Sequence, residues 1–202
     1  MPTKLVAIDP RHPASEPLAE SASVLSAGGL VAFPTETFYG LGAAALDRNA
    51  VRRVFTLKGR PESRPLLVLV DGVAMAESIA EIPWHARALI ARHWPGPLTL
   101  VFHARPVVHD DVTASTGTIG VRWTSHPVAR GLATALRAPV TAPSANPTGA
   151  MPPTSASQVI AAFPDAIDVV LDAGETTGGL PSTVVDVTVD PPRVIRAGAV
   201  RL

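Results

Sequence analysis

The chain has 202 residues, of which 47% are hydrophobic, and its 17 basic (Lys, Arg) and 17 acidic (Asp, Glu) side chains give a formal net charge of zero. Its length and apolar content suit a single domain with a sizeable core spanning residues 1–202. The charge balance gives no reason to expect strong non-specific binding to nucleic acid or membranes, and the absence of cysteine excludes disulfides, thiolate catalysis and cysteine-ligated metal centres.

The sequence predicts no targeting signal in its first residues. Residues 1–15 lack an apolar segment of the kind that signal peptides contain, and no later stretch has the roughly 18 apolar residues that a membrane span requires. We therefore expect an N-terminal extension over residues 1–15, a cytoplasmic location and no membrane partner.

Apolar spacing and turn residues predict helices and strands mixed along the chain. Helices are expected at 16–27 (capped by Ser15, stopped by Gly28 and Gly29), 49–57 (capped by Asn49), 73–79, 83–93, 127–136 and 155–163 (with Ser155 and Gln158 as a capping box). Strands are expected at 30–33, 66–70, 98–102, 119–123, 140–142, 169–171, 183–187 and 194–195. The last strands follow one another without room for crossover helices, so the prediction is an α/β (α+β) domain with a twisted, mixed open sheet flanked by helices.

The familiar nucleotide and metal motifs are missing. No phosphate loop of the G-x-x-x-x-G-K-[ST] type occurs, and Gly40-Leu41-Gly42 lacks the third glycine of a dinucleotide-binding fingerprint. The six histidines never adopt a metal-ligand spacing, so no protein metal site is expected.

Three other segments bring polar groups to the ends of predicted strands. The first, Pro34–Gly42, places two threonines, a carboxylate and flexible glycines where ligands gather in α/β sheets, although the same residues also suit a plain turn. The second, Lys58–Leu66, carries Lys58, Arg60 and Arg64 on a short loop stiffened by two prolines, which suits either a phosphate clamp or a solvated basic loop.

The third segment, Pro139–Gly149, ends a strand in small polar residues. Ser144 and Asn146 are two positions apart, so an extended backbone would direct a hydroxyl and an amide toward one ligand. The purely structural alternative is that the same residues form an ordinary Asx or ST turn. Thr118 and Arg122 share a face of the strand segment TIGVRW (118–123), and a buried Arg122 would need a carboxylate from the protein or from a ligand.

Taken in order, several of these segments closely resemble the YrdC family between about Gly28 and Gly198. The matching segments are PTETFYGLG (34–42), KGRP with RPL (58–66), WPGPLTLV (94–101), GVRW (120–123), APSAN (142–146) and STVVD (182–186) followed by Arg196. The resemblance implies a cationic concave groove and the synthesis of threonylcarbamoyl-AMP and pyrophosphate from L-threonine, bicarbonate and ATP. The product would serve the threonylcarbamoyladenosine modification of tRNA through downstream tRNA-modification proteins. Magnesium would accompany the ATP.

The resemblance also implies roles for individual residues. The catalytic group would be Lys58, Arg60, Ser144 and Asn146. ATP would contact Arg60, Arg64, Thr118, Ser144, Pro152 and Arg196. Threonine would contact Thr37, Arg122, Ala142 and Ser182, with Arg122 as the partner of its carboxylate. Residues 174–181 are expected to form a mobile loop over the groove.

The sequence departs from the family pattern at two places. Leu69 stands where a histidine near the threonine is frequent, and Trp123-Thr124 stands where a smaller residue and proline are common. Two alternative functions remain open at this point. One is a carbamoyltransferase-type reaction that starts from carbamoyl phosphate. The other is a non-catalytic module that holds an RNA backbone in the groove, although aromatic residues for base stacking make up only 4% of the chain.

Overall fold

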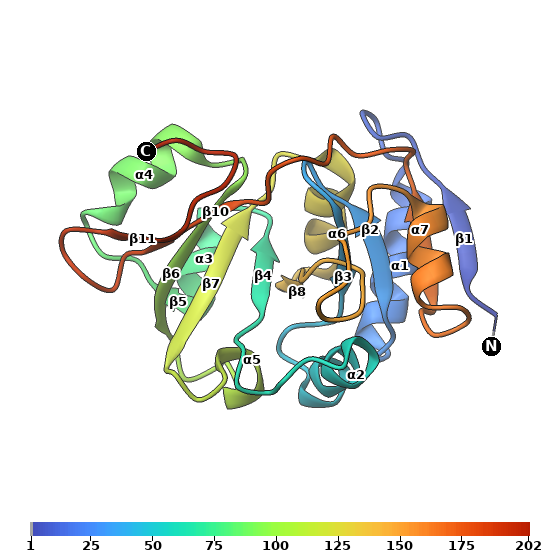
Figure 1. Cartoon of the computed structure of the whole chain (residues 1–202), viewed down its shortest axis with the longest axis horizontal. Helices are drawn as coiled ribbons and strands as arrows, with labels where there is room; N and C mark the ends of the chain where they lie inside the picture. The colour runs from blue at the N-terminus through green and yellow to red at the C-terminus, as the bar shows by residue number, and fades with distance from the viewer. Residues whose placement is uncertain (1) are drawn as a thin grey trace.

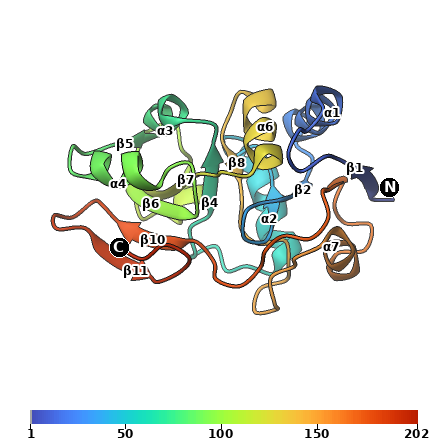
Figure 2. The ribbon, with the colours of Figure 1, turned by 90° about the horizontal axis from the view of Figure 1, so that it is seen from above.

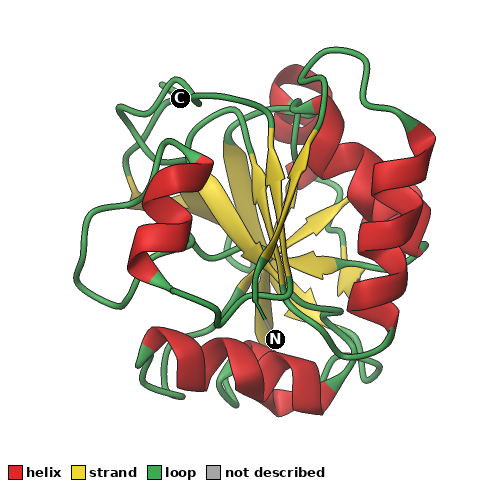
Figure 3. Ribbon diagram, turned by 90° about the vertical axis from the view of Figure 1, so that its right-hand side faces the viewer, coloured by secondary structure: helices red, strands yellow, loops and turns green. Residues whose placement is uncertain are grey.

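The computed structural model describes residues 2–202, and Met1, the first residue of the expected N-terminal extension, lies outside them. The strands occupy the centre of the molecule and the helices surround them, as Figure 3 shows. The predicted α/β class with mixed sheets and flanking helices is confirmed.

The strands form two mixed sheets, one on each side of the view in Figure 1. The four-stranded sheet has the order β1 (Lys4–Ala7), β9 (Val169–Asp172), β2 (Val31–Pro34) and β3 (Tyr39–Gly42). The seven-stranded sheet has the order β11 (Arg193–Arg196), β10 (Thr183–Asp186), β6 (Leu98–Ala104), β7 (Thr118–Trp123), β4 (Leu67–Val70) and β8 (Val140–Thr141), with β5 (Ala80–Glu81) paired to β6. Both sheets contain parallel and antiparallel pairs.

The two sheets meet where β3 lies beside β8. Isolated bridges join Gly40 to Ser144 and Ala44 to Val140, so the single sheet expected from the sequence is two sheets in contact. The junction is tight, because a Cβ atom on Gly42 would lie 2.7 Å from Phe33 Cε1 and 2.9 Å from Val140 Cγ1. A glycine at this position therefore lets the sheets approach each other.

The helices pack on the outside of the sheets. They are α1 (Ser15–Ser26), α2 (Arg48–Lys58), α3 (Val73–Ile79), α4 (Ala86–His93), α5 (Asp110–Thr113), α6 (Pro127–Leu136) and α7 (Ala156–Ala162). Helices α1 and α6 pack together over an apolar cluster that includes Leu25, Phe33 and Leu132 (Figure 2). Among residues 2–202, no helix combines the length and the apolar character needed to cross a membrane.

The helix ends differ from the sequence prediction in detail. Asp47 caps α2, because its carboxylate accepts hydrogen bonds from the N–H groups of Asn49 and Ala50, so the predicted cap at Asn49 was wrong. The N-cap of α1 is Ala14, without a side-chain bond, and Ser15 is the first residue of the helix. Ser155 does cap α7, by accepting from the N–H of Gln158.

The sequence prediction omits three strands, β1, β3 and the two-residue β5, together with the short helix α5, and one predicted helix begins later than expected. Residues 4–7 were assigned to an extension but form β1 at the sheet edge, where mostly exposed side chains give no alternating pattern. Residues 39–42 were read as a turn but form β3, whose two glycines hide its strand character. The helix expected from residue 83 begins at Ala86, after a turn in which Ala86 N–H donates to the Pro83 carbonyl.

Candidate functional site

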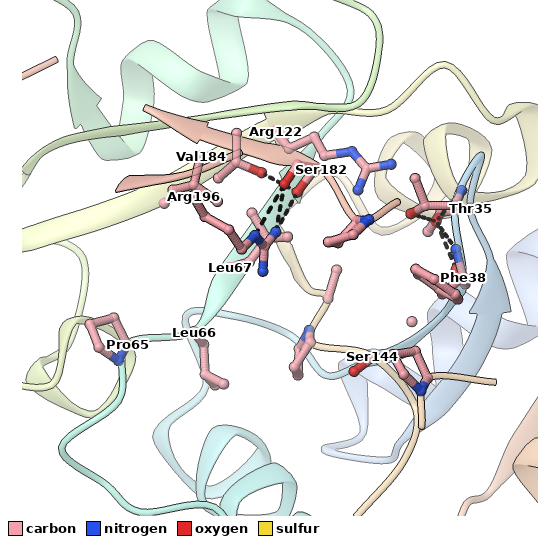
Figure 4. A pocket seen from close by; sticks show the side chains of 18 of the residues that line it. Thr35, Phe38, Pro65, Leu66, Leu67, Arg122, Ser144, Ser182, Val184 and Arg196 are labelled. Carbon is pink, nitrogen blue, oxygen red and sulfur yellow. Dashed lines mark hydrogen bonds between the residues drawn. The ribbon is translucent and has the colours of Figure 1, made fainter. Parts of the chain in front are cut away.

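A cavity of about 550 Å³ lies between the seven-stranded sheet and the junction of β3 with β8 (Figure 4). Its volume is in the range typical of small-molecule sites. The strands contribute residues at alternate positions, such as Thr99 and Val101 on β6 and Gly120 and Arg122 on β7, because residues two apart share a face of a strand. Four cations, Lys58, Arg60, Arg122 and Arg196, line this one cavity.

Arg122 forms a buried ion pair on the β7 side of the cavity. Its Nη2 lies 2.6 Å from Oε2 of Glu36, and the side chains are only 4% and 17% exposed. The same Oε2 accepts a hydrogen bond from the Thr124 hydroxyl, and Oε1 accepts one from the Ser125 N–H. Burial acts to raise the pKa of the Glu36 carboxyl, but Arg122 and Thr124 outweigh it and hold that pKa below its ordinary value. Glu36 is therefore ionised at neutral pH, and it is the carboxylate partner that a buried Arg122 was predicted to require.

Arg122 nevertheless keeps unused hydrogen-bonding capacity. Within residues 2–202, its buried Nε and Nη2 make no hydrogen bond of acceptable geometry, although Nη2 is in ionic contact with Glu36. A guanidinium has five N–H donors. Because these two atoms are themselves buried, an anionic group in the cavity that Arg122 lines would meet Nη1, which has no hydrogen bond within residues 2–202.

Arg196, on β11, is tied to a pair of hydroxyls. Its Nε and Nη2 donate to the Ser182 carbonyl oxygen, and Nη2 also donates to the Ser182 Oγ at 3.1 Å. The Ser182 Oγ lies 2.9 Å from the Thr99 Oγ1. Burial, together with the charge of Arg122, lowers the pKa of Arg196. The two arginines therefore form one cationic end of the cavity, next to Ser182 (Figure 4).

Lys58 lines the cavity at the end of α2, and its Nζ contacts Ser144, which lies across the cavity from Arg122 and Ser182 in Figure 4. It is the last residue of α2, which Gly59 ends in the left-handed conformation at φ +57°. The Nζ donates to the carbonyl oxygens of Ser144 and Asn146. Burial, with a smaller contribution from the charge of Arg60, lowers the pKa of Lys58 to about 8.

Arg60 follows on the loop that leaves α2. Its Nε donates to the Arg64 carbonyl oxygen and its Nη2 donates to the Pro65 carbonyl oxygen at 2.7 Å. These bonds fold the loop around the guanidinium, and burial, then the charge of Arg64, lowers the Arg60 pKa. The loop thus presents Arg60 to the cavity while Arg64 contributes its backbone.

Most of the residues predicted from the sequence meet at this cavity. Those that line it are Thr37, Lys58, Arg60, Arg122, Ala142, Ser144, Pro152, Ser182 and Arg196. Three do not: Arg64, Thr118 and Asn146. Thr118 lies at the start of β7, on the face that carries Arg122, and its hydroxyl is paired with that of Thr116. The predicted convergence of Ser144 and Asn146 was wrong in one respect, because the Asn146 amide points into its own loop.

Sequence reasoning missed three residues of the site. Glu36 was seen only as a carboxylate in the first segment, although the argument that Arg122 needs a partner could have found it. Thr99 and Tyr39 line the cavity from β6 and β3, and both lie within segments that resemble the family, at 94–101 and 34–42, but neither is given a role in the sequence prediction. Thr35 forms the local turn that the sequence offered as the structural alternative for this segment. Its hydroxyl donates to the Phe38 carbonyl and accepts from the N–H groups of Thr37 and Phe38.

Leu69 is fully buried in the apolar cluster beneath α6, and Leu67 is the β4 residue that lines the cavity. Position 69 lies opposite Arg122 in the strand pairing, so it is close to the cationic end without being exposed in the cavity.

Residues 174–181 cross between the two sheets from β9 to β10 (Figures 1 and 2). This strap is held to the β2–β3 loop, because the Thr177 hydroxyl donates to the Glu36 carbonyl and Gly178 N–H donates to the Thr37 carbonyl. At its start, the Tyr39 hydroxyl donates to the Gly174 carbonyl at 2.7 Å. The mobility expected of this segment stays a prediction.

No group of three or more His, Asp or Glu side chains in the described part of the chain is arranged to hold a metal ion. The polar side chains that line the cavity are cations and hydroxyls, and the nearby carboxylate of Glu36 is already paired to Arg122. The residues present therefore do not fit a metal site of the protein's own, and the magnesium expected with ATP stays a prediction about the nucleotide.

The chain is similar to several known proteins. Residues 23–198 match the Sua5/YciO/YrdC family, which carries the description "Telomere recombination". A relative in Pyrococcus abyssi, named threonylcarbamoyl-AMP synthase, is 45% identical over 183 residues, which cover 90% of this chain and 54% of the relative. A Bacillus subtilis relative of the same name is 37% identical over 185 residues, covering 91% of this chain and 54% of the relative.

Among solved structures, the crystal structure of P. abyssi Sua5 complexed with L-threonine superimposes with a TM-score of 0.93 at 42% identity. The match covers 97% of this chain and 58% of that protein. The chain thus spans about half the length of the curated relatives described above.

Proposed function

Since the chain belongs to the Sua5/YciO/YrdC family, we propose that it is an L-threonylcarbamoyladenylate synthase, which joins L-threonine, bicarbonate and ATP. The observation that carries this proposal is the convergence of Lys58, Arg60, Arg122 and Arg196 on one cavity of suitable size. Two anionic substrates that react with each other need several cations to bring them together.

The end of the cavity around Arg122 is the place for threonine. The unused donors of Arg122 suit an α-carboxylate, with Thr37, Ala142 and Ser182 around it. Glu36 pairs with Arg122 and so limits the positive charge at this end. The resulting electrostatics favour a zwitterionic amino acid over a polyanion.

The opposite end is the place for the nucleotide phosphates. Lys58 and Arg60 combine a compact ammonium with a planar guanidinium, and Ser144 adds a hydroxyl beside them. Arg196, which lies near Arg122, is positioned for a phosphate that faces the threonine end. Arg64, Thr118 and Asn146 lie outside the cavity lining, so a role for them as direct nucleotide contacts receives no support from the geometry.

The reaction has two steps. The free amine of threonine attacks the carbon of bicarbonate, and loss of water leaves an N-carboxylate. An oxygen of this carbamate then attacks the α-phosphorus of ATP and forms the new P–O bond as the bond to pyrophosphate breaks. The products are threonylcarbamoyl-AMP and pyrophosphate, and no covalent enzyme intermediate is needed.

The side chains at the cavity are consistent with that chemistry. Burial raises the pKa of the Tyr39 hydroxyl to about 12, so Tyr39 stays protonated and does not act as a base near neutral pH. The cavity instead offers positive charge for the oxygens of the transition state. A role in tRNA modification, with downstream proteins that consume the product, belongs to the same proposal, as does a contact of RNA with the cationic cavity.

A pyrophosphate-release assay tests the proposal. Release from ATP should require both L-threonine and bicarbonate. Release that requires carbamoyl phosphate would instead favour the transferase reaction. Binding of tRNA with a steep salt dependence, but without ATP turnover, would favour the RNA-binding module.

A further inference from the structure

Asn146 has no amide donor left for a ligand. Its Nδ2 donates to the carbonyl oxygens of Pro147 at 2.9 Å and Ala150 at 2.8 Å. A carboxamide has only two N–H donors, so both are in use. The residue is 6% exposed, and its Oδ1 is buried without a hydrogen-bond partner anywhere in the described chain. Asn146 therefore does not reach the cavity with its side chain.

The loop that this amide folds is attached to Lys58 at two levels. The carbonyl oxygens of Ser144 and Asn146 accept hydrogen bonds from Nζ of Lys58. In return, Thr148 N–H donates to the backbone carbonyl of Lys58 at 2.8 Å. The end of α2 and residues 144–150 are thus held together as one unit.

This arrangement sets the direction of the Lys58 ammonium. An ammonium has three N–H donors, and the two backbone carbonyls take two of them. Lys58 lines the cavity, and no third partner for its Nζ is found in residues 2–202. One donor is consequently left for an anionic group in the cavity.

We infer that Asn146 is a positioning residue that acts through Lys58. Its amide bridges two carbonyls of the following turn, so that the carbonyls at 144 and 146 face the lysine ammonium. An alanine cannot form this bridge, and a serine can form only half of it. The inference deepens the proposed function, in which Lys58 binds the nucleotide phosphates.

The chain offers an unusually direct test, because it contains only two lysines, Lys4 and Lys58. Isotopic labelling of the lysine side chains gives two NMR signals, and the exposed Lys4 serves as the internal reference. We expect the Lys58 signal to titrate near pH 8 in the wild type. In Asn146→Ala the midpoint should rise by about one unit as water reaches the ammonium, since burial is the main cause of the shift.

A matched control comes from the second asparagine of the chain. Asn49 is exposed on α2, the helix that carries Lys58, so Asn49→Ala should leave the Lys58 midpoint unchanged. Asn146→Ser should give a Lys58 titration midpoint between those of the wild type and Asn146→Ala. If Asn146→Ala fails to fold, this milder variant tests the role of Asn146. An unchanged Lys58 midpoint in a folded Asn146 variant would overturn the inference.

A double-mutant cycle with ATP supplies the second readout. Asn146→Ala should raise the Kd for ATP about tenfold in the wild-type background, but by less than twofold in the Lys58→Met background. Equal losses in both backgrounds would mean that Asn146 contacts the nucleotide itself. If the wild type does not bind ATP, the proposed function fails, while the lysine titration still decides the role of Asn146.

Discussion

Replacing Glu36 by glutamine tests the ion pair that organises one end of the cavity. The substitution keeps the shape of the side chain but removes its charge, so Arg122 is left buried without a counter-ion at 4% exposure. Breaking a buried pair on one side costs about 3–5 kcal/mol. Thr124 and Ser125 donate to different carboxylate oxygens, so the single amide oxygen of glutamine can keep only one of these bonds, and the expected loss is at least about 3 kcal/mol.

The loss should be visible in both urea and thermal unfolding. In a chain of this size, 3 kcal/mol corresponds to a decrease in Tm of about 6–12 °C. The matched control is Glu20→Gln, because Glu20 pairs with Lys4 at the surface, where both side chains are about half exposed. That variant should lose no more than about 1 kcal/mol.

The effect also has a defined pH dependence. The folded-state pKa of Glu36 lies below its ordinary value of 4.5, so the charged pair stabilises the protein fully above that pH. The contribution is lost as the pH falls through the folded-state pKa. The stability gap between wild type and Glu36→Gln should therefore close in acid. A gap below about 1 kcal/mol at pH 7 would refute the assignment of this pair as a structural element of the site.

Three further predictions concern the cavity and its walls. Arg60→Ala should lower ATP-dependent pyrophosphate release by at least about tenfold. The circular dichroism spectrum should stay unchanged, because the Arg60 guanidinium lies on a loop outside the helices and strands. Turnover at the wild-type rate would show that Arg60 is not part of the site. The Kd for ATP, measured by calorimetry, should rise as the pH passes 8 and Lys58 loses its proton. In Lys58→Arg the Kd should not change over this pH range, because arginine stays protonated. The same rise in the wild type and the variant would exclude Lys58 as its cause. Gly42→Ala should lower the free energy of unfolding by about 1–3 kcal/mol, because the new methyl group would collide with Phe33 and Val140. The control is Gly72→Ala, where an added Cβ has no atom within 4 Å and the loss should be less than about 1 kcal/mol. Equal losses in the two variants would argue against a tight junction between the sheets.

Much of the fold could be predicted because most elements carry a strong local signal. Helix α6 begins at Pro127 and ends at Leu136 as expected, since proline at the first position and one apolar face both mark it. The strand β4 is a continuous apolar run, and β6 and β7 are mostly apolar segments bounded by turn residues. The edge strand β1 and the glycine-containing β3 lack such signals, because pairing with distant segments rather than local pattern creates them.

The site was predictable to a similar extent. The resemblance to the YrdC family is confirmed by the family match over residues 23–198, and it brought most of the lining residues into view. What it could not supply is how each side chain is held. The pairing of Glu36 with Arg122 depends on tertiary contacts between segments more than 80 residues apart. The direction of the Asn146 amide, away from the cavity, depends on how a single loop folds.

The most direct test of the proposed synthase is detection of its product. Purified protein is incubated with ATP, L-threonine and isotopically labelled bicarbonate, and the reaction is followed by mass spectrometry. We expect threonylcarbamoyl-AMP with the label in its carbamoyl carbon, and loss of that product in Arg60→Ala. Absence of the product from protein that binds ATP and L-threonine, or formation of a carbamoyl adenylate only with carbamoyl phosphate, would contradict it.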